Sequence, residues 1–116
     1  MRTEMLTKPC GPRRSTCERL REELQALAKG HALILSHSEK SWASITFAGT
    51  RHRLDLEFAG AEAVDAAENF IAYLPEHEFA IPRQLVADAA VIAVDHRLGR
   101  DPRMEVRIEL LLLDEE

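Results

Sequence analysis

The last third of the chain alternates apolar and polar residues over two long segments. In the second segment an apolar residue stands at every second position from Met104 to Leu112, and charged residues stand between most of them. This period of two predicts a strand with one face toward a core and the other toward water. We therefore predict a hairpin of two strands, Leu85–Arg97 and Arg103–Leu113, joined by the loop 98–102. The rest of the chain must pack against this hairpin.

The register of the hairpin stays open. A five-residue loop pairs Arg97 with Arg103, whereas a four-residue loop pairs Leu98 with Arg103. Because side chains alternate along a strand, the two choices bring opposite faces of the first strand together with the apolar face of the second.

Both strands also carry apolar residues on a second face. Leu111 and Leu113 interrupt the charged face of their strand, and Ile92 and Val94 lie on the less regular face of the first strand. Apolar residues on both faces imply cover on both faces. A helix can cover one side, and we expect a second copy of the chain to cover the other in a two-fold dimer. These four residues form the predicted interface.

The first thirty residues predict a tail and a helix. Residues 1–14 are basic and contain prolines and a glycine, which favours a flexible tail and places the folded domain at 15–116. Ser15 and Glu18 have the spacing of a capping box, in which each side chain satisfies a free backbone donor of the other. Leucines at helical spacing follow, and Gly30 suits a left-handed helix end.

Alternating residues after Gly30 predict three strands, with turns at 38–41 and at Gly49-Thr50: His31–His37, Trp42–Ala48 and Arg51–Phe58. A helix at 61–74 ends before Pro75, which cannot continue it. The predicted fold is α+β in the order helix–three strands–helix–two strands, a five-stranded and largely antiparallel sheet with two helices. The second helix should cover one sheet face. The first helix covers the other face in part or packs beside the second.

Composition limits the classes of function. A chain of 116 residues suits one domain, and a net charge of −5 disfavours a nucleic-acid binder, which needs a basic face. The sequence has no apolar run near the length that crosses a bilayer and no signal-peptide core, so we expect a cytoplasmic protein without a membrane partner. In that compartment we expect Cys10 and Cys17 to be free thiols, with a disulfide as the alternative.

The strongest candidate for acid–base chemistry is the cluster Glu76-His77-Glu78, because carboxylates favour the charged form of a neighbouring histidine. We predict no metal site and no cofactor, since no histidine has the spacing typical of metal ligands. The five histidines are His31, His37, His52, His77 and His96.

These observations favour a non-catalytic binding or assembly module that acts as a homodimer and has protein partners. The alternative is a small-ligand-binding protein or enzyme with a pocket near residues 75–82, where Glu76, His77 and Glu78 would act. No motif identifies a family. The order of elements alone is similar to that of the small, acidic, dimeric chaperones of type III secretion, although a terminal helix of that family is missing here.

Overall fold

The predicted hairpin is present, and its register is now decided. In the computed structural model, which describes residues 7–9 and 16–115, β4 (Gln84–Arg97) and β5 (Arg103–Asp114) pair antiparallel along their length. Arg97 pairs with Arg103, as the five-residue loop requires. The register shifts at two bulges in β4, between Val86 and Asp88 and between Val91 and Ala93. Each bulge reverses the alternation of side chains, so the apolar residues on one face of β4 are even-numbered along part of the strand and odd-numbered along the rest.

The three strands predicted before the second helix are two longer strands, so the sheet has four long strands. β2 (Leu33–Ala43) and β3 (Ala48–Ala59) pair antiparallel, and residues 38–41, predicted as a turn, lie within β2. The turn is instead at 44–47, where Ser44 N donates to Phe47 O at 2.7 Å and Phe47 N donates to Ser44 Oγ at 3.1 Å. The polar run is tolerated in a strand because β2 lies near the sheet edge and buries little of it.

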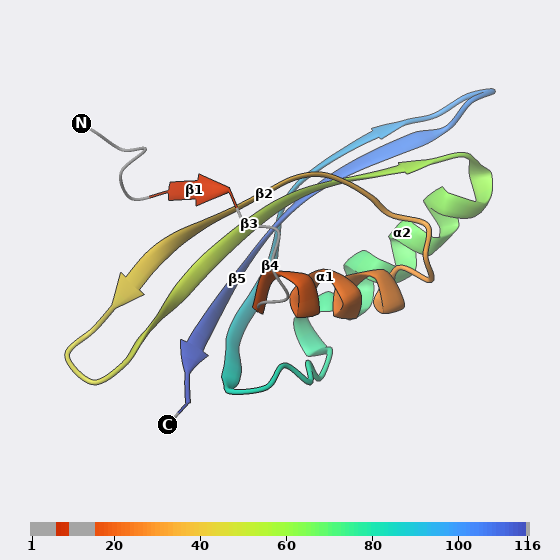
Figure 1. Cartoon of the computed structure of the whole chain (residues 1–116). Coiled ribbons are helices and arrows are strands. Elements are labelled where there is room, and N and C mark those ends of the chain that lie inside the picture. The colour runs from red at the N-terminus through yellow and green to blue at the C-terminus, as the bar shows by residue number, and fades with distance from the viewer. Residues whose placement is uncertain (1–6, 10–15, 116) are drawn as a thin grey trace.

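The strand order is β1-β2-β3-β5-β4 (Figure 1). β1 (Thr7–Pro9) is three residues of the predicted tail, and it pairs with residues 38–40 of β2. The other residues of the predicted tail, and Ser15 of the predicted capping box, lie outside the described residues. The observed order is therefore helix, two strands, helix, two strands, with β1 as a short addition at the edge.

Both helices lie on the same side of the sheet (Figure 1). α1 (Thr16–Leu27) is followed by Gly30 at φ 79°, the predicted left-handed end, and α2 (Ala61–Tyr73) continues into the 3-10 turn η2 (Leu74–Glu76). Leucines of α1 and the apolar face of α2 share one core with the inward residues of β3 and β5. The first helix therefore packs beside the second, and no helix of the described residues covers the outer sheet face. The largest fully buried side chains of this core include Leu20, Leu24, Leu54, Phe58, Phe70 and Ile108.

Gly49 lies inside β3, where a turn was predicted. A Cβ at this position would lie 2.0 Å from Leu112 O and 2.9 Å from Leu113 Cα, both backbone atoms of β5. Glycine in a strand often marks such a close approach of two backbones. The residue is therefore explained by contact between β3 and β5 and not by turn geometry.

Candidate functional site

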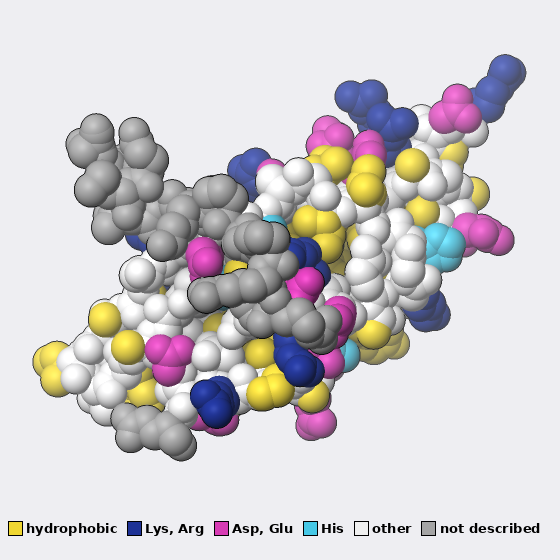
Figure 2. All heavy atoms as spheres, viewed as in Figure 1, with side chains coloured by type: hydrophobic (Ala, Val, Ile, Leu, Met, Phe, Trp, Pro, Cys, Tyr) yellow, Lys and Arg dark blue, Asp and Glu magenta, His cyan; other side chains and the backbone are white. Residues whose placement is uncertain are grey.

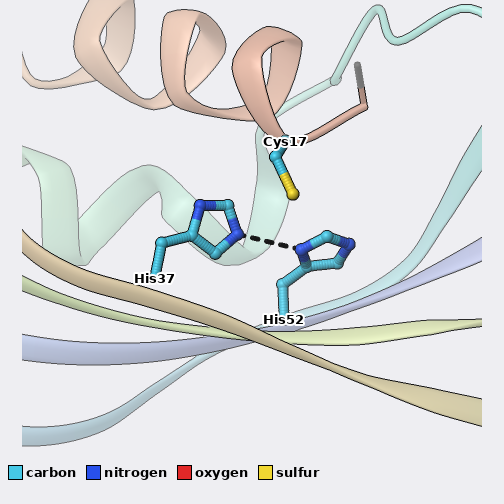
Figure 3. Close-up of side chains that lie close together, drawn as sticks. All are labelled: Cys17, His37 and His52. Carbon is cyan, nitrogen blue, oxygen red and sulfur yellow. Dashed lines mark hydrogen bonds between the residues drawn. The ribbon is translucent and has the colours of Figure 1, made fainter. Parts of the chain in front are cut away.

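Two buried histidines face α1 from the sheet. His37 lies on β2 and His52 on β3, with 9% and 1% of their surfaces exposed. His37 pairs with Leu54, and Glu39 pairs with His52, so the two imidazoles are diagonal neighbours on the inner face. His37 Nε2 and His52 Nδ1 are 2.9 Å apart (Figure 3).

Arg21 of α1 fixes the tautomer of both rings. Its Nη1 is 3.0 Å from His37 Nδ1, and a guanidinium only donates, so His37 Nδ1 accepts. The proton of a neutral His37 must then be on Nε2, from which it is donated to His52 Nδ1. His52 in turn carries its proton on Nε2. A directed chain of hydrogen bonds thus runs from Arg21 through His37 to His52.

Burial keeps both imidazoles neutral. It lowers the pKa of His37 from 6.5 to about 3, with further lowering by the charges of His52 and Arg21, and it lowers the pKa of His52 from 6.5 to about 4. A charged imidazole loses its hydration in such a place, and a nearby cation disfavours it further. At neutral pH both imidazoles are therefore uncharged, and the pair is poorly matched to general acid–base work, which needs a pKa near the working pH.

The sulfur of Cys17 completes this cluster. Cys17 is buried on α1, and its Sγ lies with ring nitrogens of His37 and His52 in a group whose atoms are all within 4.8 Å of one another (Figure 3). Cys17 is disulfide-bonded, so the prediction of free thiols is wrong for this residue. Cys10, the other cysteine of the sequence, lies outside the described residues.

The alternation along β3 contains one signal for this cluster that the prediction from spacing missed. His52 shares its parity with Leu54, Leu56 and Phe58, the inward residues of β3, so the alternation itself indicates a buried histidine. The partner His37 could not be found in this way, because it depends on the register between β2 and β3.

The predicted acid–base cluster does not converge. His77 Nε2 is 3.3 Å from Glu23 Oε1 of α1, and the rings of His77 and Phe79 pack in a T-shaped arrangement with centroids 4.6 Å apart. Glu23 Oε1 also accepts from Ala80 N at 3.4 Å. These contacts attach the connector 77–80 to α1. Glu76 and Glu78 are both exposed and make no described contact with His77.

The predicted interface residues do not lie together on one surface. Leu111 and Leu113 lie on the outer sheet face, opposite Arg51 and Gly49 of β3. Val94 pairs with Val106, whose side chain is in the core, so Val94 lies on the helix side of the sheet, where it stays 46% exposed. Ile92 is at the second bulge of β4, which is an edge strand, and is 49% exposed.

Charged side chains cover the centre of the outer sheet face. Arg107 Nε is 2.8 Å from Asp55 Oδ1, and Arg53 Nε is 3.0 Å from Glu109 Oε2, each pair joining β3 to β5. The hydrogen bond from Arg107 lowers the pKa of Asp55. Opposite charges directly across two strands stabilise a face that meets water.

One end of the sheet carries exposed apolar side chains instead. A depression of about 740 Å³ lies between the β2–β3 turn and the ends of β4 and β5, and we call it the sheet-end groove. The turn forms one wall of this groove and carries Ile45 and Phe47, which are 105% and 52% exposed. Figure 2 shows hydrophobic side chains at the left end of the molecule, where Figure 1 places this turn. The groove is lined by Ala43, Ser44, Ile45, Thr46, Phe47, Ala48, Leu85, Leu113, Asp114 and Glu115.

The comparisons with known proteins show the fold alone. No family model matches the chain, and no curated protein matches it. Among solved structures, the chain is similar to a chain of the structure described as the virion of a native gene transfer agent particle, with a TM-score of 0.57 and 14% sequence identity. The match covers 85% of this chain and 92% of that chain. No helix in the described part of the chain is long and apolar enough to cross a membrane.

Proposed function

We propose that this chain is a non-catalytic structural protein that assembles with copies of itself in a phage-like particle, with a two-fold dimer as the smallest unit. The observation that carries the proposal is the position of the helices. Both cover one side of the sheet, and on the other side no helix of the described chain covers Leu85, which is 50% exposed at the end that carries the sheet-end groove. The likeness to a chain of a gene transfer agent virion supports the same class of function.

The end of the sheet offers a self-complementary contact. Ile45 and Phe47 form one wall of the sheet-end groove and remain exposed there, so an apolar projection and a recess with apolar and polar walls belong to the same patch. A two-fold contact requires one patch that matches itself. In the proposed dimer the tip of each copy lies in the groove of the other, and Leu85 and Leu113 form the floor of each groove.

The charged centre of the outer face fits the rim of such an interface. Arg107 and Asp55 pair with each other within one chain, as do Arg53 and Glu109, so they need no partner from another chain. Interfaces concentrate apolar contacts in the middle and leave charged residues at the solvated rim. The alternative with a ligand pocket near residues 75–82 has less support, because His77 and Phe79 pack against each other and His77 contacts α1.

The assembly is tested by light scattering on the purified full chain at micromolar concentration. We expect a dimer or a larger assembly. Ile45→Lys and Leu85→Lys replace exposed side chains, so each should weaken association by about tenfold or more while the fold is kept. The matched control is Leu98→Lys, which changes a leucine that is 81% exposed at the opposite end of the β4–β5 hairpin and should leave association unchanged.

Two outcomes would contradict the proposal. If the wild-type chain stays monomeric up to about 100 μM, a concentration well above the dissociation constant of a stable dimer, self-assembly through this patch is excluded. A dimer that survives both Ile45→Lys and Leu85→Lys has its interface elsewhere. The predicted interface pair Ile92 and Val94 on the β4 edge is then the next surface to change.

A further inference from the structure

We propose that the cluster of Cys17, His37 and His52 is a redox-gated site for a divalent transition metal such as Zn²⁺, formed when the disulfide of Cys17 is reduced. The three side chains come from α1, β2 and β3, and their ligand atoms already lie within 4.8 Å of one another. In Figure 3 the sulfur lies over the histidine pair and both rings rise from the sheet toward it. The inference does not depend on the proposed function.

The donor set suits Zn²⁺. A thiolate and two neutral imidazoles are typical zinc ligands, and three protein ligands leave a fourth position for water. Buried nitrogen and sulfur donors disfavour Mg²⁺ and Ca²⁺, which prefer oxygen. Neither histidine has to lose a net proton before binding, because both are neutral at pH 7 in their buried place.

The disulfide controls whether the site can bind metal, since a sulfur in a disulfide is a poor ligand for zinc. A dithiol reductant supplies two electrons and two protons, breaks the S–S bond and becomes a cyclic disulfide itself. Cys17 is then a thiol, and it loses its proton to solvent when the metal binds. The ion lies between the thiolate and the two rings. It takes the place of the proton that His37 Nε2 now donates to His52 Nδ1.

Arg21 opposes this site. When His37 Nε2 binds the ion, the proton of the neutral ring must lie on Nδ1, the atom that now accepts from Arg21 at 3.0 Å. The guanidinium must therefore turn away, and it also repels the ion. Its side chain is only partly buried on α1, so it has a path to water. The side-chain oxygen of a glutamine at this position could accept a hydrogen bond from His37 Nδ1–H instead. Residues that hydrogen-bond to zinc-binding histidines commonly do this.

The site is tested with Co²⁺, whose thiolate complexes absorb through sulfur-to-cobalt charge transfer. We expect no such band from the oxidised wild type and a band from the reduced wild type that excess Zn²⁺ removes. Cys10→Ser leaves a single cysteine, so this chain should bind Co²⁺ without reductant. Arg21→Gln in that background should tighten binding by about tenfold, the usual size of an outer-ligand effect.

Matched variants show which residues hold the ion. Cys17→Ser should abolish the band, and His37→Leu or His52→Leu should weaken binding by about a hundredfold or more, whereas His96→Gln on β4 should have no effect. Circular dichroism reports whether each variant is folded. As a second readout, Zn²⁺ should raise the melting temperature of folded Cys10→Ser but not of oxidised wild type. A folded Cys10→Ser chain with no charge-transfer band at millimolar Co²⁺ overturns the proposal, as does weaker binding in Arg21→Gln.

Discussion

Acidification from about pH 7 to about pH 4 is expected to remove most of the stability of this fold. Burial holds the pKa of His37 at about 3 and that of His52 at about 4, against 6.5 for an exposed histidine. Between these values the unfolded chain binds about two more protons than the folded chain. The full contribution of the two histidines to the free energy of unfolding is therefore present above about pH 6.5. Below that pH the free energy of unfolding falls by roughly 2.7 kcal/mol per pH unit, which amounts to about 6 kcal/mol by about pH 4. A domain of this size has about 5–15 kcal/mol to lose.

Urea unfolding of the oxidised chain at a series of pH values measures this slope. The double variant His37→Leu, His52→Leu removes both groups, so its free energy of unfolding should change far less between pH 6.5 and pH 4. The control His96→Gln changes an exposed histidine of β4 and should keep the wild-type slope. Asp55 adds little to this change, because the stability that comes from its lowered pKa is lost only when the pH falls below 3.8, the ordinary pKa of an aspartate. Equal stability at pH 7 and pH 4.5 in the wild type would show that the histidines are not buried as neutral groups.

Replacing Gly49 with alanine is expected to destabilise the chain by on the order of 3 kcal/mol or more, the upper range for overpacking. The new Cβ would meet Leu112 O at 2.0 Å, and this oxygen is backbone, so no side-chain rotation relieves the contact. β3 and β5 would have to separate at the end of the sheet that carries the sheet-end groove. Chemical denaturation of Gly49→Ala beside the wild type gives the difference in free energy.

Gly60→Ala is the matched control for that change. Gly60 has φ 100°, but a Cβ there has no atom within 4 Å, so alanine adds conformational strain without a clash. With ψ 162° this backbone lies in an extended positive-φ region that is essentially limited to glycine, and such strain costs about 1–3 kcal/mol for a residue with a side chain. We expect Gly49→Ala to be the more damaging of the two. If Gly60→Ala costs as much or more, the close approach of β3 and β5 is not what requires glycine at position 49.

Local patterns predicted most of the elements because those elements obey local rules. β5 keeps a strict period of two from Met104 to Leu112, and α2 begins after Gly60 and ends near Pro75, where proline cannot continue a helix. The net charge of −5 also disfavoured nucleic-acid binding, and the lack of a long apolar run disfavoured a membrane-spanning segment. The same local patterns failed where a strand is polar. Ser38-Glu39-Lys40-Ser41 has the composition of a turn, yet it pairs with β3 because a strand near the sheet edge needs little apolar surface.

Neighbours along the chain thus specify the hairpin, the two helices and their capping glycines, and these could be predicted from the order of residues. Contacts between distant segments set the rest. The second bulge of β4, between Val91 and Ala93, places Asp88 and Asp95 on one face although one is even-numbered and the other odd-numbered, because pairing with β5 and not spacing sets the face of each residue. The packing of α1 beside α2 left the outer sheet face uncovered and set Arg21 and Cys17 over His37 and His52. Such a cluster depends on how three separate elements meet in space, and no spacing along one element records that.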